Sequence, residues 1–156
     1  MRKFAKPFAV AIAVLLLVTS LSACSSKIDT MGKIEKDGKV IMGTNAEFPP
    51  FEYRDENGDV AGFDVALAEE IAAEMGVELV IEDMDFNSLI AALKSGKIDF
   101  VAAGMTVTED RKENADFSQA YFDASQVIIV RADNQDILGA ADLAGMRIGV
   151  QEGTTG

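Results

Sequence analysis

The sequence predicts an α/β fold built around a mainly parallel sheet. Short apolar runs typical of strands alternate with longer stretches in which apolar residues recur at helical spacing. Glycine follows these helical stretches and ends them before the next strand begins. Strands that alternate with helices of this length are usually joined by right-handed βαβ units, which place the strands parallel to one another.

The first expected strand covers residues 39–44, where apolar and β-branched side chains dominate. Segments 52–54 and 60–62 then flank the pair Asn57-Gly58, which is typical of the tight turn in a β-hairpin. We therefore expect a strand followed directly by a hairpin.

A helix is predicted over residues 63–75, with Asp64 near its start and Gly76 at its end. Its larger apolar residues recur at every fourth position: Phe63, Leu67, Ile71 and Met75. Residues 77–82 alternate as a strand does, and residues 86–94 form a second predicted helix that Gly96 ends. The residues expected to face inward from this second helix are Leu89, Ile90 and Leu93.

Shorter elements are expected in the remainder of the chain. Residues 98–102 read as a strand, and Thr108 is followed by the start of a short helix. Two further strands are predicted at residues 125–130 and 146–150, with a short helical piece at 136–143 between them.

Ligands of parallel sheets collect beyond the carboxyl ends of the strands. The segments expected there are 44–51, 103–111 and 151–155. The first combines polar side chains with two aromatic residues and two prolines, which stiffen the backbone. A rigid loop with aromatic side chains in the core is an equal alternative for this segment.

Arg111 is the strongest single candidate for ligand binding. Thr108 followed by Glu109 and Asp110 is typical of a helix N-terminus, so Arg111 lies close to free backbone N–H groups. A guanidinium in that position can hold a carboxylate through two parallel hydrogen bonds. On spacing alone, a surface ion pair with Glu109 or Asp110 is an equal alternative.

Residues 1–23 are predicted to be a signal peptide. Arg2, Lys3 and Lys6 form a basic start, and an apolar run follows over residues 8–18. This run is shorter than the roughly 20 apolar residues that a transmembrane helix needs. We therefore set a membrane-spanning anchor aside.

The end of this peptide, Leu21-Ser22-Ala23-Cys24, resembles the bacterial lipobox. The resemblance implies that Cys24 carries a diacylglyceryl group that anchors the protein at the membrane, in a periplasm or on an outer face. Cys24 has no disulfide partner because it is the only cysteine, and the polar segment 24–37 is expected to act as a tether. Cleavage that leaves a free cysteine is the alternative.

Composition excludes several classes of function. The chain has no histidine, which rules out Ser-His or Cys-His pairs and His-based zinc sites within it. A net charge of −12 without a basic aromatic stripe argues against nucleic acid. The spacing of Asp55, Asn57 and Asp59 resembles a calcium loop, but Val60 and Ala66 stand where that loop needs glycine and glutamate. We expect no metal and no cofactor.

Four segments, in this order, resemble the extracytoplasmic amino-acid-binding proteins of ABC importers, the family 3 solute-binding proteins. The resemblance runs from about Lys39 to the last residue and is carried by these segments: Gly-Thr-Asn-Ala-Glu-Phe-Pro-Pro-Phe-Glu-Tyr (43–53), Gly-Phe-Asp-Val-Ala-Leu-Ala-Glu-Glu-Ile-Ala (62–72), Phe-Asn-Ser-Leu-Ile-Ala-Ala-Leu-Lys-Ser-Gly-Lys-Ile-Asp (86–99) and Ala-Gly-Met-Thr-Val-Thr-Glu-Asp-Arg (103–111).

The resemblance implies a periplasmic-binding-protein-like fold in which two α/β lobes close on an amino acid. It implies that residues 38–122 form a nearly complete first lobe, that the chain crosses over near 121–124, and that residues 123–156 begin a truncated second lobe. The acidic residue for the ligand's α-ammonium group would lie beyond this sequence. We expect residues 25–156 alone to be marginally stable and to bind weakly or not at all.

The resemblance also implies roles for individual residues. Arg111 would clamp the α-carboxylate, helped by Thr106 and by the backbone near Gly104. Thr155 would add a carboxylate contact from the second lobe. The other residues would surround the ligand's side chain, the aromatic pair packing on it and the polar pair at the pocket edge: Phe48, Phe86, Asn45 and Glu47.

The implied function is that of a monomeric, lipid-tethered receptor that delivers a free amino acid to the membrane subunits of an ABC permease, without catalysis. A ligand-sensing domain of a signalling receptor is one alternative, and it requires a downstream transmembrane helix. A dehydratase or lytic transglycosylase of the same fold is another, and it requires a catalytic acid. The residues do not specify which amino acid is bound.

Overall fold

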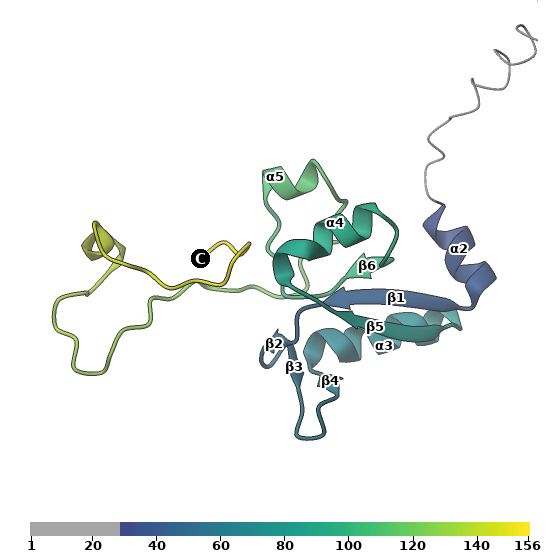
Figure 1. Ribbon diagram of the computed structural model, residues 1–156, viewed down its shortest axis with the longest axis horizontal. Helices are drawn as coiled ribbons and strands as arrows, with labels where there is room; N and C mark the ends of the chain where they lie inside the picture. The colour runs from purple at the N-terminus through teal and green to yellow at the C-terminus, as the bar shows by residue number, and fades with distance from the viewer. Residues whose placement is uncertain (1–28) are drawn as a thin grey trace, which may run out of the picture.

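The computed structural model describes residues 29–156 (Figure 1). The predicted signal peptide (1–23) and the predicted lipidation site Cys24 lie outside the described residues. Within residues 29–156, none of the helices has the length and apolar character needed to span a bilayer.

The centre of the fold is a parallel sheet with strand order β5-β1-β6. Strand β1 (Lys39–Thr44) lies between β5 (Glu78–Asp83) and β6 (Phe100–Val101), and Met42 is opposite Ile81 on one side and Phe100 on the other. The predicted α/β class with a parallel sheet is confirmed. Because the strands are parallel, their carboxyl ends open on one edge, where a ligand site is expected.

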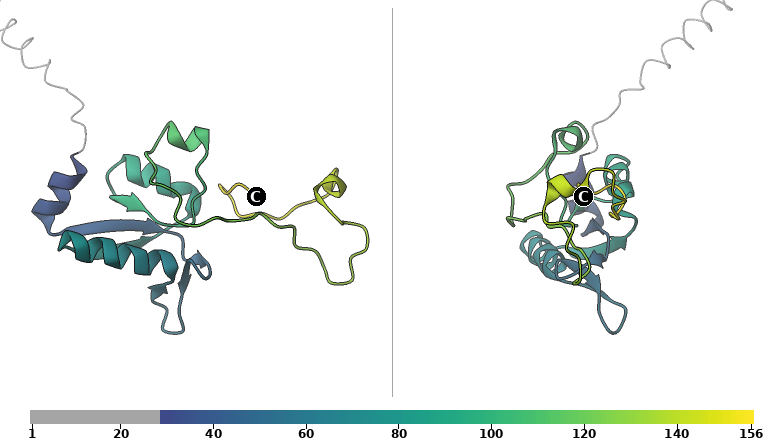
Figure 2. Two further views of the ribbon diagram at one scale, coloured as in Figure 1. Left: turned by 180° about the vertical axis from the view of Figure 1, so that it is seen from behind. Right: turned by 90° about the vertical axis from the view of Figure 1, so that its left-hand side faces the viewer.

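Two helices cover opposite faces of this sheet (Figures 1 and 2). Helix α3 (Phe63–Met75) packs on the face that presents Met42. Helix α4 (Leu89–Lys94), preceded by the 3₁₀ turn η2 (Phe86–Ser88), packs on the face that presents Ile41. Successive strand residues therefore supply two separate core clusters, as the alternation of side chains along a strand requires.

The buried face of α3 differs from the stripe that predicts the helix. Ala68 and Ala72 are almost completely buried, whereas Phe63 is 49% exposed and Ile71 is 39% exposed. Small side chains allow the helix backbone to approach the sheet closely, so the large apolar residues lie at its flanks. Phe63 instead packs edge-on against Phe51.

The hairpin forms a second, antiparallel sheet of order β2-β3-β4. Its strands are β2 (Glu47–Phe48), β3 (Glu52–Arg54) and β4 (Val60–Ala61), and β2 had not been predicted. In the turn, the Asp55 carboxylate accepts the backbone N–H groups of Asn57 and Asp59, at 2.8 and 2.9 Å. These hydrogen bonds lower the pKa of Asp55, so its carboxylate stabilises the turn.

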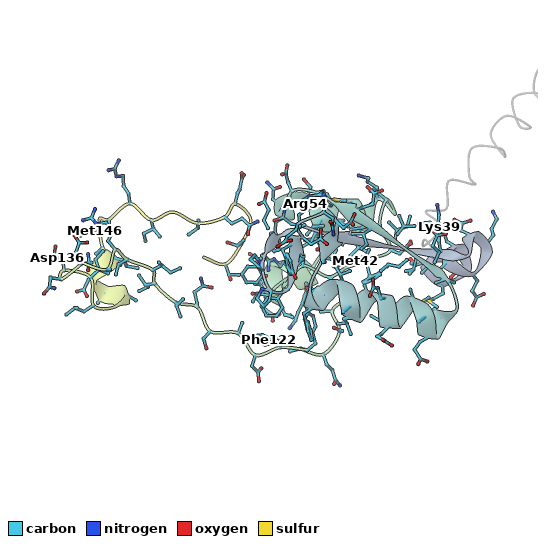
Figure 3. All side chains as sticks on the ribbon, turned by 90° about the horizontal axis from the view of Figure 1, so that it is seen from below. Lys39, Met42, Arg54, Phe122, Asp136 and Met146 are labelled. Carbon is cyan, nitrogen blue, oxygen red and sulfur yellow. The ribbon has the colours of Figure 1, made fainter. Side chains whose placement is uncertain are left out.

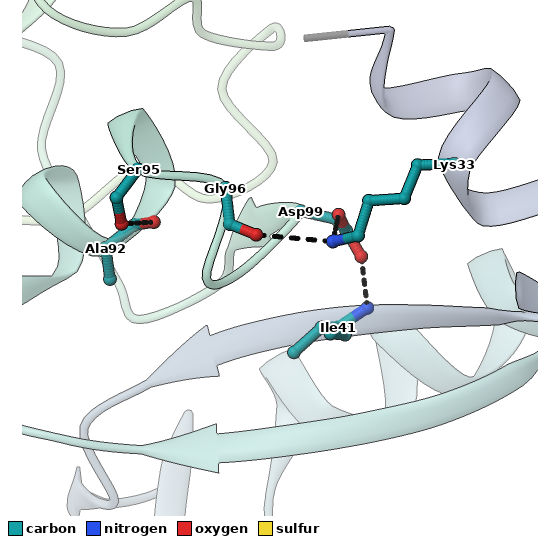
Figure 4. A network of polar contacts seen from close by, with 6 residues as sticks. All are labelled: Lys33, Ile41, Ala92, Ser95, Gly96 and Asp99. Carbon is teal, nitrogen blue, oxygen red and sulfur yellow. Dashed lines mark hydrogen bonds and ion pairs between the residues drawn. The ribbon is translucent and has the colours of Figure 1, made fainter.

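The predicted tether extends too far into the chain. Helix α2 (Thr30–Asp37) packs against the sheet, with Ile34 only 3% exposed beside Val40. It is fixed by the Lys33 ammonium group, which donates to Asp99 Oδ1 at 2.8 Å and to the Gly96 carbonyl at 3.3 Å (Figure 4). A polar segment therefore folds because one apolar residue and one ion pair dock it.

Replacing Asp99 by alanine is expected to destabilise the fold by about 3 kcal/mol. The Asp99 side chain is 2% exposed and accepts both the Lys33 ammonium group and the Ile41 backbone N–H, the latter at 2.9 Å. Its removal leaves the Ile41 N–H without this acceptor and the Lys33 ammonium group without its counter-charge. Urea denaturation measures the loss, with Asp133→Ala as the control because its pair with Arg131 is solvent-exposed. Equal stability of the two variants would contradict a stabilising role for the hydrogen bonds that Asp99 accepts from Lys33 and Ile41.

The last part of the chain runs away from the sheet, from Phe122 toward Asp136 and Met146 (Figure 3). The strands predicted at 125–130 and 146–150 are wrong, and β6 is shorter than the predicted 98–102. Of the predicted helical piece at 136–143, only the turn η3 (Ala140–Leu143) forms. Strand formation depends on a pairing neighbour, and no described segment pairs with these residues.

Candidate ligand-binding site

The candidate site lies where segments from the carboxyl ends of the parallel strands meet the end of the chain. After β1, the Asn45 side-chain oxygen accepts a hydrogen bond from the Gln151 side-chain amide at 2.5 Å. After β6, the Arg111 guanidinium donates to the Gly153 carbonyl at 2.7 Å. The structure thus brings together the segments predicted at 44–51, 103–111 and 151–155.

A pocket of about 180 Å³ lies between these segments. Phe86 lines it, and the other lining residues are polar, with carboxyl groups from three separate positions in the chain. The lining residues are Asn45, Glu47, Asp85, Phe86, Asn87, Gln151 and Glu152. Among the described residues that line it there is no lysine or arginine, so the lining itself is acidic.

Arg111 is positioned by the short helix α5 (Glu109–Lys112). Thr108 caps this helix, because its hydroxyl oxygen accepts the Arg111 backbone N–H at 3.2 Å. The guanidinium donates to the Thr106 carbonyl at 2.6 Å and lies over the Phe86 ring, 5.4 Å from its centroid. Partial burial lowers its pKa from the ordinary value, but an arginine remains charged.

Arg111 forms no ion pair with Glu109 or Asp110 among the described residues, so this alternative is not observed. Glu109 pairs with Lys112 at 2.9 Å, whereas the guanidinium of Arg111 contacts backbone carbonyls. A guanidinium has five N–H donors, so two carbonyl partners leave donors available for a carboxylate. Arg111 therefore has the geometry of an anion receptor next to an acidic pocket.

Gly104 and Phe48 lie together beside the pocket. Gly104 has φ of 52°, a region that favours glycine, and a Cβ there would lie 3.1 Å from the Phe48 ring. Phe48 is 48% exposed and stacks on Phe51, with ring centroids 5.4 Å apart. Neither Phe48 nor Gly104 belongs to the pocket lining, although Phe48 directly follows the lining residue Glu47 in the chain.

The two threonines proposed for carboxylate binding are placed differently. Thr106 contributes its carbonyl to Arg111. Thr155 is exposed and does not line the pocket, whereas Thr154 closes the turn with its hydroxyl on the Gln151 carbonyl at 2.8 Å. In that turn Gly153 packs so closely on Asn87 that a Cβ would approach the Asn87 Cβ to 2.8 Å.

Sequence reasoning missed four lining residues, although the last two lie in the predicted segment 151–155: Asp85, Asn87, Gln151 and Glu152. Asp85 and Asn87 flank the predicted Phe86 and follow strand β5 directly, so they lie on the same edge as Asn45. The position of 85–87 after a parallel strand was the available signal. Because a helix is predicted from residue 86 onward, the sequence assigns Asp85 and Asn87 to the start of a helix and does not identify them as site residues.

The model of the family described as bacterial extracellular solute-binding proteins, family 3, matches residues 40–155. The chain belongs to this family. Its fold is therefore the periplasmic-binding-protein-like one, and members of the family are extracellular, as their description states.

Relatives within family 3 include arginine-binding proteins. The arginine-binding extracellular protein ArtP of Bacillus subtilis is 44% identical over 135 residues, covering 86% of this chain and 51% of ArtP. A crystal structure of a mutant ArgBP from T. maritima superposes with a TM-score of 0.78 at 50% identity, covering 81% of this chain and 56% of that one. The chain spans about half the length of these relatives.

A structure of part of the same T. maritima protein is also similar. It is described as the arginine-bound form of domain 1, and it matches with a TM-score of 0.58 at 53% identity. The match covers 58% of this chain and 72% of that domain. These relatives are named as binding proteins.

Proposed function

We propose that this chain belongs to the substrate-binding lipoprotein of an amino-acid ABC importer and that its ligand is a cationic amino acid, arginine first. The observation that carries this proposal is the placement of Arg111 beside an acidic pocket. The guanidinium lies over Phe86, and Phe86 also lines the pocket that contains Glu47, Asp85 and Glu152.

The two parts of the site suit the two ends of such a ligand. Arg111 would hold the α-carboxylate through paired N–H···O bonds. The carboxylates of Glu47, Asp85 and Glu152 would attract the cationic side chain, and Asn45 and Gln151 would accept or donate its remaining hydrogen bonds. The aromatic face of Phe86 would pack on the ligand's stem or guanidinium.

The relatives support arginine as the first ligand to test. ArtP is named an arginine-binding protein, and domain 1 of the T. maritima protein is described in an arginine-bound form. In that protein, domain 1 holds arginine in a crystal, and this chain matches 72% of that domain. This agrees with a site built mostly from the segments around Arg111.

We further propose that Cys24 carries the lipid anchor and that the loaded protein delivers its ligand to an ABC permease as a monomer. Since helix α2 begins at Thr30, the tether would consist of residues 24–29. The intact mass of the protein extracted from membranes tests the anchor. A mass that includes the acyl chains on Cys24 supports it, and an unmodified cysteine rejects it.

Titration calorimetry on the full-length mature protein tests the proposed ligand, with the twenty amino acids as the panel. Arginine is expected to bind most tightly, followed by lysine or histidine, because only these carry side-chain positive charge that the acidic pocket would favour. Tighter binding of a neutral or acidic amino acid would reject the proposed selectivity. No specific observation favours the sensor or the enzyme alternative.

Replacing Glu47 by glutamine is expected to weaken arginine binding about tenfold while leaving citrulline binding within about twofold. Citrulline has the shape of arginine but a neutral side chain, so the Glu47 charge acts only on arginine. Calorimetry with both ligands measures the ratio. Glu74→Gln, on the exposed side of α3, is the matched control. Equal losses for arginine and citrulline would show that Glu47 does not set charge selectivity.

A further inference from the structure

Two carboxyl groups are buried side by side between the hairpin and helix α3. Glu52, on β3, is 1% exposed and Asp64, in the first turn of α3, is 0% exposed. One oxygen of each, Glu52 Oε2 and Asp64 Oδ1, has no hydrogen-bond partner among the described residues. Two ionised carboxylates at such a place would repel one another strongly, so the pair needs a proton.

Glu52 is the member of the pair that holds this proton. Burial raises the pKa of Glu52 from 4.5 to about 9, and the negative charge of the neighbouring Asp64 adds to the shift. Two groups face the pair: the Tyr121 hydroxyl, and the Gly104 backbone N–H from residues 103–111, which we call the ligand segment. Neither of them carries a positive charge.

Asp64 joins two functional segments through one oxygen. Its Oδ2 accepts the Gly104 backbone N–H at 2.8 Å and the Tyr121 hydroxyl at 2.9 Å. Gly104 belongs to the segment that carries Thr106 and Arg111. Tyr121 directly precedes Phe122, from which the chain runs away from the sheet toward Asp136 (Figure 3). Burial and Asp64 raise the pKa of Tyr121, so its phenol stays protonated and remains a donor.

Aromatic contacts join the same segments a second time. Tyr121 stacks on Phe63 with centroids 6.1 Å apart, and Phe122 packs edge-on against Phe51 at 4.8 Å. Phe51 in turn stacks on Phe48, the residue that touches Gly104. The chain that leaves the sheet after Tyr121, which we call the departing chain, is therefore joined to the ligand segment in two ways. One is the Asp64 carboxylate, and the other is the set of aromatic contacts.

The pair does not act on the ligand directly. Neither carboxyl group lines the pocket, and both are shielded from solvent. A buried ion or carboxyl pair is also a poor source of stability, because apolar residues of the same volume often stabilise as well or better. The buried position of the pair is explained if Asp64 fixes the segments of Gly104 and Tyr121 relative to each other.

We propose that Glu52 and Asp64 are positioning residues that share one proton and hold the ligand segment at Gly104 and the departing chain at Tyr121 on a single carboxylate, so that ligand affinity depends on that proton. The predicted effect on ligand affinity rests on the proposed function, because it assumes that the ligand is arginine. The shared proton and the two hydrogen bonds of Asp64 do not depend on that function. Loss of the proton would put two negative charges together and loosen both hydrogen bonds of Asp64.

The direct test needs no ligand. In the full-length protein, the amide proton of Gly104 is followed by NMR as the pH rises. Its chemical shift is expected to titrate with a midpoint at about 9 in the wild type, because Glu52 ionises beside its acceptor. In Glu52→Gln, which keeps the shape of the side chain but cannot ionise, the titration is expected to vanish. A Gly104 shift that changes equally in both proteins would overturn the proposal.

The functional test compares arginine affinities of the same two proteins by calorimetry at about pH 7 and about pH 10. The ligand's own ammonium group titrates equally in both experiments, so the ratio of the two affinities is the readout. We expect the wild type to lose about tenfold more affinity than Glu52→Gln over this range. An unchanged ratio would overturn the link between the proton and the site.

Tyr121→Phe supplies a second, independent variant, because it removes the hydroxyl and keeps the ring on Phe63. We expect about tenfold weaker binding at pH 7, with Tyr53→Phe as the control for loss of a phenol elsewhere. Wild-type affinity in Tyr121→Phe would count against the proposal. If arginine fails to bind while the Gly104 titration appears as described, the proposed ligand is rejected and the proton sharing is supported.

The free energy of unfolding of the wild type is expected to fall as the pH rises, because Glu52 is protonated in the folded protein. Because the folded-state pKa of Glu52 is about 9 and its ordinary value is 4.5, the folded protein holds a proton that the unfolded chain releases between these pH values. The wild type is therefore expected to lose stability relative to Glu52→Gln as pH rises through this window. A constant difference in urea midpoint between pH 5 and 8 would contradict the protonated state of Glu52.

Discussion

Replacing Arg111 by alanine is expected to weaken amino-acid binding at least about 100-fold. The change removes the charged fork that lies over Phe86 and is held by the carbonyls of Thr106 and Gly153. A ligand carboxylate would then enter an acidic site without its counter-charge. Arg111→Lys is expected to recover only a small part of the affinity, because an ammonium group cannot make the paired contacts.

The matched control for this change is Lys112→Ala, the next residue of the same short helix. Lys112 pairs with Glu109 across the exposed surface and contacts no pocket residue among those described. We expect its affinity to stay within about twofold of the wild type. If Arg111→Ala binds arginine as tightly as Lys112→Ala does, the carboxylate is bound elsewhere.

Replacing Leu89 by alanine is expected to reduce the free energy of unfolding by about 2–5 kcal/mol. Leu89 is 0% exposed and lies in the cluster with Ile98 and Ala103, directly under the start of the ligand segment. Gly43 fits closely above it, since a Cβ at Gly43 would lie 3.2 Å from a Leu89 methyl carbon. The cavity left by the substitution would therefore loosen both β1 and the loop that follows β6.

Urea denaturation measures this loss, with Leu138→Ala as the matched control. Leu138 is 87% exposed, so its truncation is expected to change stability by less than about 0.5 kcal/mol. A Leu89→Ala protein as stable as Leu138→Ala would show that the cluster under the ligand segment is not a packed core.

The order of the main elements could be predicted because their periodicity is strong. The strand at 39–44, the helix at 63–75 and the helix begun at Phe86 all appear in the structure. The buried side of α3 could not be predicted, since Ala68 and Ala72 have too little hydrophobicity to outweigh Phe63 and Ile71. Hydrophobic spacing identifies a helix better than it identifies the face that packs.

Two other errors have one physical cause, which is that tertiary contacts decide weak local preferences. Helix α2 is polar, and its docking depends on Ile34 and on the distant Asp99. Residues 125–130 are rich in β-branched side chains, yet Ile129 is 90% exposed because no described strand pairs with them. Neither outcome is encoded within the segment itself.

Much of the candidate site followed from strand ends and helix capping. The cap at Thr108 could be predicted, as could the meeting of Asn45 with the 151–155 segment, whereas carboxylate binding by Arg111 stays a prediction. Asp85 was obscured by the helix that follows it. The buried carboxyl of Glu52 gave no signal, because a hairpin residue with alternating neighbours reads as solvent-facing.

The central claim is that Arg111 binds the ligand's α-carboxylate while the acidic pocket receives its cationic end. Calorimetry of the full-length protein with arginine and with agmatine tests this most directly, because agmatine is arginine without the carboxylate. We predict that arginine binds and that agmatine binds at least about 100-fold more weakly, with the difference lost in Arg111→Ala. Agmatine binding as tight as that of arginine would contradict the claim.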